Sequence, residues 1–290
     1  MRLPIVGVWL AAMLLVAAGC AGSKESYPSI TTDPTHVEIP GKVVWVDLIT
    51  EDLEGSKQFY GDLFGWSFEP VADNYVTITL DGAPLGGMLE VERKDKEHVS
   101  QWLTYISVAD VDASVEFFES NEGELHRGPV DIAGRGRAAL VTDSQGGYVA
   151  LIRSDSGDPP DNDDLPGQHE FMWVDYVAND TDQAIEFLGN AFGWKSEVHT
   201  QKEDRSYYVF KQGDEYRAGL FENPWSHVRP NWLAYVRVAD AREAVDRATS
   251  LGGSVVLEPA PDIRNGSVAI IQDPFGAAIA LQKYPFKESS

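Results

Sequence analysis

The feature that most constrains the fold of this chain is an internal repeat. The segment WVDLITEDLEGSKQFYGDLFGW at 45–66 recurs as WVDYVANDTDQAIEFLGNAFGW at 173–194, identical at nine of twenty-two positions without a gap. Two further blocks follow in the same order, 102–110 matching 232–240 and 142–153 matching 272–283. Three matching blocks in one order indicate that a whole domain is duplicated in tandem.

Each copy alternates between two hydrophobic periods. In the first copy, an apolar strand at 42–49 precedes Asp52, a helix N-cap, and a helix with one apolar face that ends at Gly65. Three strands in meander order follow, and the pattern then starts again at QWLTYISV with Asp110 as the next cap. We therefore expect an α+β fold in which each domain is two βαβββ modules, four in the whole chain.

The two copies are separated by the segment SDSGDPPDNDDLPGQ. It carries five Asp and three Pro in fifteen residues, which favours a solvated linker because it has almost no apolar area to bury. A calcium loop is the alternative, but the EF-hand ligand spacing is missing. We place the domains at 41–154 and 169–286 and the linker at 155–168.

The N-terminus has the layout of an export signal. Arg2 precedes a short apolar run and Gly19, and Cys20 follows as the only cysteine of the chain. The segment VAAGC resembles the lipobox of bacterial lipoproteins, which implies a signal peptide at 1–19, a lipidated Cys20 and a flexible tether over 20–40. We expect an extracytoplasmic protein anchored to the bacterial cell envelope, with an uncleaved membrane anchor as the alternative.

The charge balance bears on the partners. The formal net charge is −23, which repels nucleic acid backbones and anionic lipid headgroups. We expect no DNA or RNA partner and no membrane contact beyond the lipid anchor, and a neutral or cationic small molecule as the easier ligand.

The four modules, the segment DLEGSKQFYGDLFGW and the closing DSQGGYVAL and DPFGAAIAL resemble the vicinal oxygen chelate superfamily. This group includes glyoxalases, bleomycin-resistance proteins and extradiol dioxygenases, and the match is closest to its two-domain, glyoxalase-like subgroup. The resemblance implies paired modules that curve their strands around a cleft. In catalytic members, a divalent metal lies at the base of that cleft.

The resemblance also implies where metal ligands would lie. The family positions are a His or Gln early in the first strand of a module and a Glu late in its last strand. Counting from the helix caps and closing turns places only apolar residues there, namely Trp45, Leu103, Ala150, Gly86 and Gly87 in the first copy and Trp173, Leu233, Ala280, Ala218 and Gly219 in the second. We therefore predict no metal and no other cofactor, with a divalent metal on other ligands as the alternative.

The strand alternation suggests what lines the cleft instead. Asp47 shares a face with Trp45, and the next module adds Tyr105. The second copy repeats this set as Trp173, Asp175 and Tyr235. Arg135 and Arg137 could reach an anionic group from a strand of the cleft, and Arg137 is a further candidate ligand contact unless it only pairs with a neighbouring Asp. Carboxylates beside aromatic rings suit a cationic or aromatic molecule, although the rings could simply fill the space of the missing metal.

Three functions remain open. The first is a non-enzymatic protein that binds a small cationic or aromatic molecule at the envelope. The second is a metal-dependent lyase, isomerase or dioxygenase with ligands at other positions, and the third is an envelope protein-interaction module. No Ser-His-Asp set, phosphate loop or HExxH motif is present in the sequence, so covalent catalysis has no candidate.

Overall fold

A computed structural model describes residues 27–92, 100–161, 164–202, 205–226 and 228–284. The predicted signal peptide and lipidated cysteine therefore lie outside the described residues. Two eight-stranded mixed sheets contain all of the strands in this part of the chain, in the orders β2-β3-β4-β1-β5-β8-β7-β6 and β10-β11-β12-β9-β13-β16-β15-β14. The second order repeats the first, as the duplication predicts.

The four predicted βαβββ modules are present. The first contains β1 (Val43–Thr50), α1 (Leu53–Phe64), β2 (Ser67–Ala72), β3 (Tyr75–Leu80) and β4 (Ala83–Glu90), and the second contains β5 (Gln101–Ser107), α2 (Val111–Ser120), β6 (Glu124–Ile132), β7 (Gly136–Thr142) and β8 (Tyr148–Ser154). The third contains β9 (Phe171–Ala178), α3 (Thr181–Phe192), β10 (Lys195–Lys202), β11 (Arg205–Gln212) and β12 (Glu215–Glu222). The fourth contains β13 (Asn231–Val238), α4 (Ala241–Ser250), β14 (Ser254–Leu257), the 3-10 turn η1 (Arg264–Gly266), β15 (Val268–Gln272) and β16 (Ala278–Lys283).

Local sequence explains where the helices begin and end. An aspartate caps each helix, and its side chain accepts a hydrogen bond from a backbone N–H of the first turn. Gly65 and Gly193 end α1 and α3 in the left-handed conformation, which glycine adopts without strain. The buried face of α1 contains the residues that the periodicity predicts: Leu53, Ser56, Phe59, Tyr60, Leu63 and Phe64.

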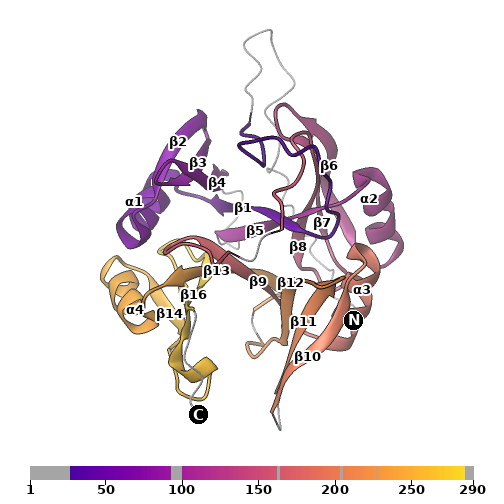
Figure 1. Cartoon of the computed structure of the whole chain (residues 1–290). Coiled ribbons are helices and arrows are strands. Elements are labelled where there is room, and N and C mark those ends of the chain that lie inside the picture. Colours follow the sequence, from indigo (N-terminus) through magenta and orange to yellow (C-terminus); the bar gives the residue numbers. More distant parts are fainter. Residues whose placement is uncertain (1–26, 93–99, 162–163, 203–204, 227, 285–290) are drawn as a thin grey trace, which may run out of the picture.

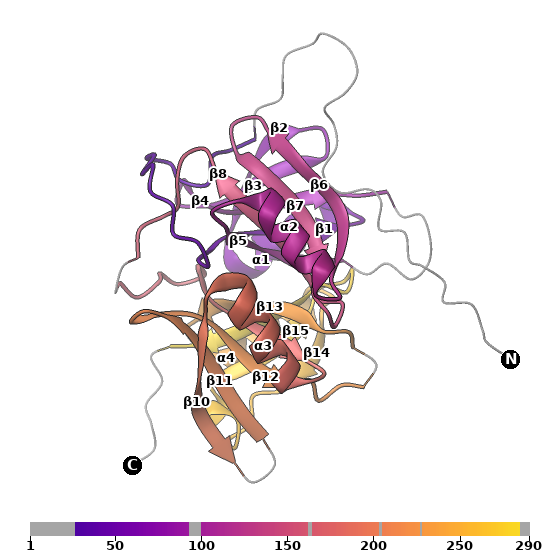
Figure 2. The same ribbon diagram turned by 90° about the vertical axis from the view of Figure 1, so that its right-hand side faces the viewer.

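The two sheets are joined by cores that both domains share. One apolar cluster combines side chains of α1 with side chains of α4 and β13, and a second combines α2 with α3 and β9. In Figure 1, α1 lies above α4 on one side of the molecule and α2 lies near α3 on the other. Figure 2, turned by 90°, shows the same two layers one above the other. The helical faces of both sheets thus turn toward each other, and the opposite, inner faces turn away.

The tryptophans that follow each helix belong to this shared core. Trp66 and Trp194 are buried, as expected. Their indole N–H groups donate across the domain boundary, to the carbonyl oxygens of His169 and Gly41 at 2.8 and 3.0 Å. Within the described residues, no helix is long and apolar enough to cross a bilayer.

The described part of the predicted tether, residues 27–40, contacts the first domain at several points. Ile30 and Thr31 are buried, and the backbone N–H groups of Tyr27 and His36 donate to the carbonyl oxygens of Ala133 and Ser156. Apolar side chains in this segment have a sheet face to cover, which outweighs its polar composition. We call residues 27–31 the strap.

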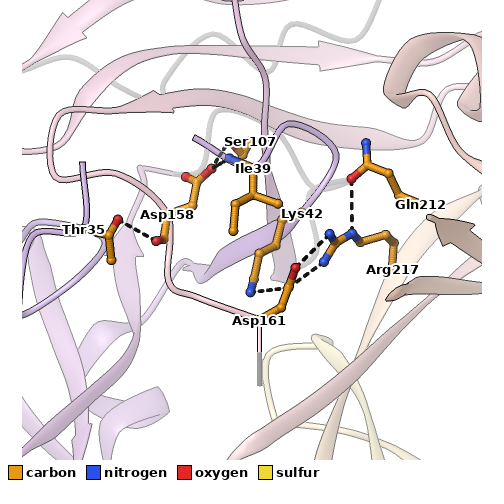
Figure 3. A network of polar contacts seen from close by, with 8 residues as sticks. All are labelled: Thr35, Ile39, Lys42, Ser107, Asp158, Asp161, Gln212 and Arg217. Carbon is orange, nitrogen blue, oxygen red and sulfur yellow. Dashed lines mark hydrogen bonds and ion pairs between the residues drawn. The ribbon is translucent and has the colours of Figure 1, made fainter. Parts of the chain in front are cut away.

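The prediction of a wholly solvated linker is wrong, because Asp158 is 1% exposed. Its carboxylate accepts hydrogen bonds from Ile39 N and Ser107 Oγ at 2.6 and 2.5 Å (Figure 3). Asp161 pairs with Lys42 of the first domain and Arg217 of the second, and these cations lower the pKa of its carboxyl to about 2, Arg217 contributing most. The aspartates that suggested a solvated segment instead fasten it to both domains.

Candidate ligand-binding site

The inner face of the first sheet carries the predicted Trp–Asp–Tyr set. Trp45, Asp47 and Tyr105 are all less than 6% exposed, and Trp45 and Tyr105 belong to one apolar cluster with Leu103 and Ala150. The cross-strand register places Tyr105 beside Trp45 and beside Ala150. Trp45 Nε1 donates to Asp47 Oδ1 at 2.8 Å. Alternation along β1 and β5 therefore predicted this face correctly.

Two more residues complete the set: Tyr75, which the sequence analysis did not assign, and Arg135, which it named only as able to reach an anionic group. Tyr75 on β3 donates its hydroxyl to Asp47 Oδ1 at 2.8 Å. Arg135, in the turn before β7, donates to Tyr75 Oη at 2.8 Å and lies 3.4 Å from Asp47 Oδ2. Its guanidinium carbon also lies 4.9 Å from the centroid of the Trp45 ring. The cation that these aromatic rings contact is thus Arg135, a residue of the chain itself.

The second sheet builds the same five-residue set. Asp175 accepts hydrogen bonds from Trp173 Nε1 at 2.8 Å, Tyr207 Oη at 2.7 Å and Tyr235 Oη at 2.5 Å. Arg264 Nη2 lies 3.7 Å from Asp175 Oδ2, and its guanidinium carbon is 4.7 Å from the Tyr207 ring centroid. We call Trp173, Asp175, Tyr207, Tyr235 and Arg264 the second-sheet cluster, and Trp45, Asp47, Tyr75, Tyr105 and Arg135 the first-sheet cluster.

A glycine beside each aspartate leaves room for its tyrosine. Gly87 pairs with Asp47 and Gly219 pairs with Asp175 in the strand register. A Cβ on Gly219 would lie 2.0 Å from Asp175 Oδ1 and 2.1 Å from Tyr207 Oη. Gly219, which lies where the family resemblance places a metal ligand, is therefore needed for the hydrogen bond between the Tyr207 hydroxyl and the Asp175 carboxylate.

Arg137, the predicted ligand contact, lies elsewhere. Its guanidinium pairs with Asp112 at 2.6 Å and with Asp131 at 3.0 Å, and its side chain is 36% exposed. Along β7, Arg137 alternates with Ala138 and shares a face with Ala139, which packs into the core on the helix side. The prediction that Arg137 lines the inner face is therefore wrong.

The protonation states are fixed by burial and by charge. Burial, and then the charge of Asp47, raise the pKa of Tyr75 above its usual value, and the same causes act on Tyr235 beside Asp175. Burial alone would lower the pKa of Arg264, but Tyr235 and Asp175 outweigh it, so the pKa lies above the usual value. At neutral pH the tyrosines are neutral donors and the arginines are cations.

The two clusters differ in how much of their arginine reaches the surface. The Arg135 side chain is 2% exposed, whereas the Arg264 side chain is 26% exposed. Trp173 is half-buried while Trp45 is buried, and half-buried apolar residues surround the second-sheet cluster, among them Met172, Phe221, Trp225 and Ile263. The second-sheet cluster is the more accessible of the two.

The residues present do not fit a divalent metal. Each inner-face carboxylate already accepts hydrogen bonds from an indole and a phenol, and a guanidinium lies where a cation would bind. In the described part of the chain, no three His, Cys, Asp or Glu residues converge as metal ligands. A divalent metal needs such a set of donor atoms, and the inner-face residues that the structure describes do not supply one.

This fold and inner face define a class, the tandem glyoxalase-like proteins. The model of the Glyoxalase/Bleomycin resistance protein/Dioxygenase superfamily matches residues 170–281, and a Bleomycin resistance protein-like N-terminal model matches residues 42–80. CFP32 of Mycobacterium bovis, named as a proposed glyoxylase, is 30% identical over 82% of this chain and 93% of its own. This chain therefore belongs to that superfamily.

Further relatives extend the comparison. The anthracycline biosynthesis protein DnrV of Streptomyces peucetius is 30% identical over 83% of this chain and 93% of its own. Among solved structures, the Mn(II)-bound glyoxalase of Novosphingobium aromaticivorans covers 84% of this chain and 82% of its own, at TM-score 0.54 and 12% identity. The 2,2',3-trihydroxybiphenyl 1,2-dioxygenase of Sphingomonas wittichii matches over 84% of this chain and 91% of its own, at TM-score 0.56 and 14% identity. At such identities the solved structures support the fold alone.

Proposed function

We propose that this chain is a small-molecule binding protein, held at the bacterial cell envelope by a lipid on Cys20, and that its ligand binds at the second-sheet cluster. The observation that carries the proposal is Arg264, whose side chain is 26% exposed and whose guanidinium lies 3.7 Å from Asp175 and over the rings of Tyr207 and Tyr235. A fixed cation on an aromatic floor provides both a charged donor and a flat apolar surface.

This arrangement changes the expected ligand. Asp175 is 0% exposed and its charge is balanced by Arg264, so a cationic ligand would meet a guanidinium before it met the carboxylate. A planar aromatic compound with an anionic or carbonyl oxygen fits better, because the oxygen can accept from Arg264 while the ring lies on Trp173 or Tyr207. The name of the relative DnrV, which ties it to an aromatic product class, supports the same direction.

Tryptophan fluorescence tests this proposal. Aromatic acids, phenols and quinones are titrated into the mature protein, with aromatic amines as the comparison set. We expect saturable quenching by members of the first group and about tenfold weaker binding for Arg264→Gln, because one charge-assisted contact is lost. Arg137→Gln is the matched control, since it removes an arginine from the outside of the other sheet, and it should bind as the wild type does.

Two results would contradict the proposal. One is tight binding of amines with unchanged affinity in Arg264→Gln, which would place the site elsewhere. The other is the absence of any ligand across the whole set.

The name of CFP32 favours a second candidate, a glyoxalase-type lyase that uses a divalent metal. Metal analysis of the purified protein after supplementation with Mn²⁺, Ni²⁺, Zn²⁺ or Fe²⁺ separates the two. A stoichiometric ion would replace the binding proposal with an enzyme. Under the binding proposal, ligand affinity does not depend on chelators.

A further inference from the structure

The strap lies against the first-sheet cluster. The ring of Tyr27 meets the ring of Tyr75 edge to face, with 5.0 Å between their centroids, and the guanidinium carbon of Arg135 is 5.8 Å from the Tyr27 centroid. Arg135 Nε donates to the carbonyl oxygen of Pro28 at 3.2 Å. Ile30 is 5% exposed in the same apolar cluster as Trp45 and Tyr105. The strap therefore gives Arg135 an aromatic ring and a carbonyl oxygen together.

The strap is positioned by the segment that leaves the first sheet. Thr31 N donates to Ser156 Oγ at 3.2 Å, and further along the chain Thr35 Oγ1 donates to the carbonyl oxygen of Asp158 at 2.8 Å. Figure 3 shows Thr35 and Ile39 on either side of Asp158. These contacts tie Thr31, Thr35 and Ile39 to the segment after β8, and Tyr27 and Pro28 contact Arg135, Tyr75 and the backbone of Ala133.

The second-sheet cluster has the same five residue types in equivalent positions. Among the described residues, no aromatic ring other than Tyr207 and Tyr235 lies over Arg264 in a cation–π contact. Arg135 has four rings over it. Three belong to the first-sheet cluster, Trp45 among them, and the fourth, Tyr27, is supplied by the strap. In the first domain, the strap therefore occupies the place that the proposed function gives to a ligand in the second.

We propose that the strap is a built-in ligand, which closes a second copy of the binding site on the first sheet and must leave before that site can take a small molecule. The ligand class follows from what the strap presents: an aromatic ring joined by a short chain to a carbonyl oxygen. This inference rests on the proposed function, because it takes the second-sheet cluster as the open form of the same site.

The linkage explains why the first site is closed in the intact chain. A segment tied to its site by a few residues acts at an effective concentration of about millimolar, so a weak free ligand cannot displace it. Weakening the strap should therefore expose the site, whereas adding ligand to the wild-type protein should fill only the second-sheet cluster.

The test uses the mature protein with the second-sheet cluster disabled by Arg264→Gln. In this background, Tyr27→Ala removes the strap's ring, and N-acetyl-L-tyrosinamide, which carries a phenol ring and amide carbonyls, is the probe. We expect Tyr27→Ala to lower the melting temperature by about 5 °C. The probe at about 10 mM should then restore at least half of that loss. In the Arg264→Gln protein that keeps Tyr27, the same probe should shift the melting temperature by about 1 °C or less.

Two matched controls define the site and the ligand class. Val37→Ala changes an exposed residue beyond the strap and should create no response to the probe. N-acetyl-L-leucinamide lacks the ring and should not restore the melting temperature. If Tyr27→Ala does not fold, Tyr27→Leu, which removes the aromatic ring and keeps apolar volume, replaces it.

The outcomes separate this inference from the proposed function. No probe response in the double variant, with ligand binding intact in the wild type, overturns the inference and leaves the proposed function standing. An equal response to the leucine probe overturns the ligand class. If the wild type binds no ligand either, the proposed function fails with it.

Discussion

At the residue scale, a glycine on each inner face decides whether the cluster can form. In Gly219→Ala, the new Cβ would overlap Asp175 Oδ1 and Tyr207 Oη, and neither can retreat because each is hydrogen-bonded in place. We expect a loss of about 1–3 kcal/mol in the free energy of unfolding, measured by urea denaturation. Gly61→Ala in α1 is the control, since its Cβ has 3.4 Å of clearance. Equal stability in the two variants would contradict the close packing of the cluster.

A buried carboxyl between the domains gives a pH-dependent prediction. Burial raises the pKa of Asp273, which accepts from Tyr60 Oη at 3.1 Å across the domain boundary. The folded state therefore takes up a proton at a pH where the unfolded chain has not, so this residue adds stability as the pH falls toward 4. The melting temperature of the wild type relative to Asp273→Asn should rise between pH 7 and pH 4.

The control for that experiment is Asp246→Asn, which makes the same change in net charge at an exposed position of α4. Because the whole protein carries a formal charge of −23, acid relieves repulsion in every variant, and the control removes that common effect. A constant difference between wild type and Asp273→Asn across this range would show that the carboxyl is not protonated on folding.

The residues of the clusters show what one sequence can predict. Trp45, Asp47 and Tyr105 follow from alternation along two strands, and the repeat carries them over to Trp173, Asp175 and Tyr235. Arg264 does not follow, because it lies in an irregular turn before a strand, with a φ of 46°. Arg135 was named together with Arg137, but residues two positions apart share a face of a regular strand, so alternation could not separate the two arginines.

The second tyrosine of each cluster was missed for a different reason. Tyr75 and Tyr207 come from β3 and β11, which reach the aspartate-bearing strand only across β4 or β12. Tyr75 opens β3 and Tyr207 is the third residue of β11, and each lies two residues before the residue that pairs with the inner-face glycine. Using this shared position requires the strand order, which the sequence pattern alone did not provide.

At the scale of elements, the segment after β8 joins three parts of the molecule. Asp158 accepts from Ile39 beyond the strap and from Ser107 on β5, so Asp158→Ala would leave one buried and one half-buried donor without an acceptor. We expect the free energy of unfolding to fall by about 2–4 kcal/mol, together with faster amide exchange over residues 31–40. Asp155→Ala, at an exposed position three residues earlier, should change the free energy by less than about 0.5 kcal/mol. Similar losses in both variants would mean that the Asp158 contacts contribute little.

Composition explains why the segment at 27–40 and the linker at 155–168 were predicted less well than the modules. Acidic and proline-rich stretches usually lack apolar area to bury, and that rule favours disorder. Here the decisive contacts are single residues: Ile30 fills a gap on the first sheet, and one carboxylate satisfies a backbone N–H and a hydroxyl. Such contacts depend on the surface next to the segment and leave no periodic signal.

At the scale of the whole molecule, the shared cores fix the directions of the two inner faces. The helical faces of both sheets are buried between the domains, so the two clusters lie on sheet faces that point away from each other. Figure 1 shows the two sheets one above the other. The second-sheet cluster therefore faces away from the end of the molecule that carries the strap. The two sites cannot contact one ligand together, and each must bind independently unless the strap couples them.

The proposed lipid anchor would orient this molecule on a membrane. Seven residue steps separate Cys20 from Tyr27 and span at most about 25 Å, so the strap end must lie close to the bilayer and the second-sheet cluster must face outward. Fluorophores placed on Asp33→Cys and, separately, on Glu258→Cys of the lipidated protein test this on vesicles that contain an acceptor lipid. Because energy transfer falls steeply with distance, we expect strong transfer from position 33 and weak transfer from position 258. The reverse order, or equal transfer from both, would contradict an anchor at Cys20 that holds the first sheet toward the membrane.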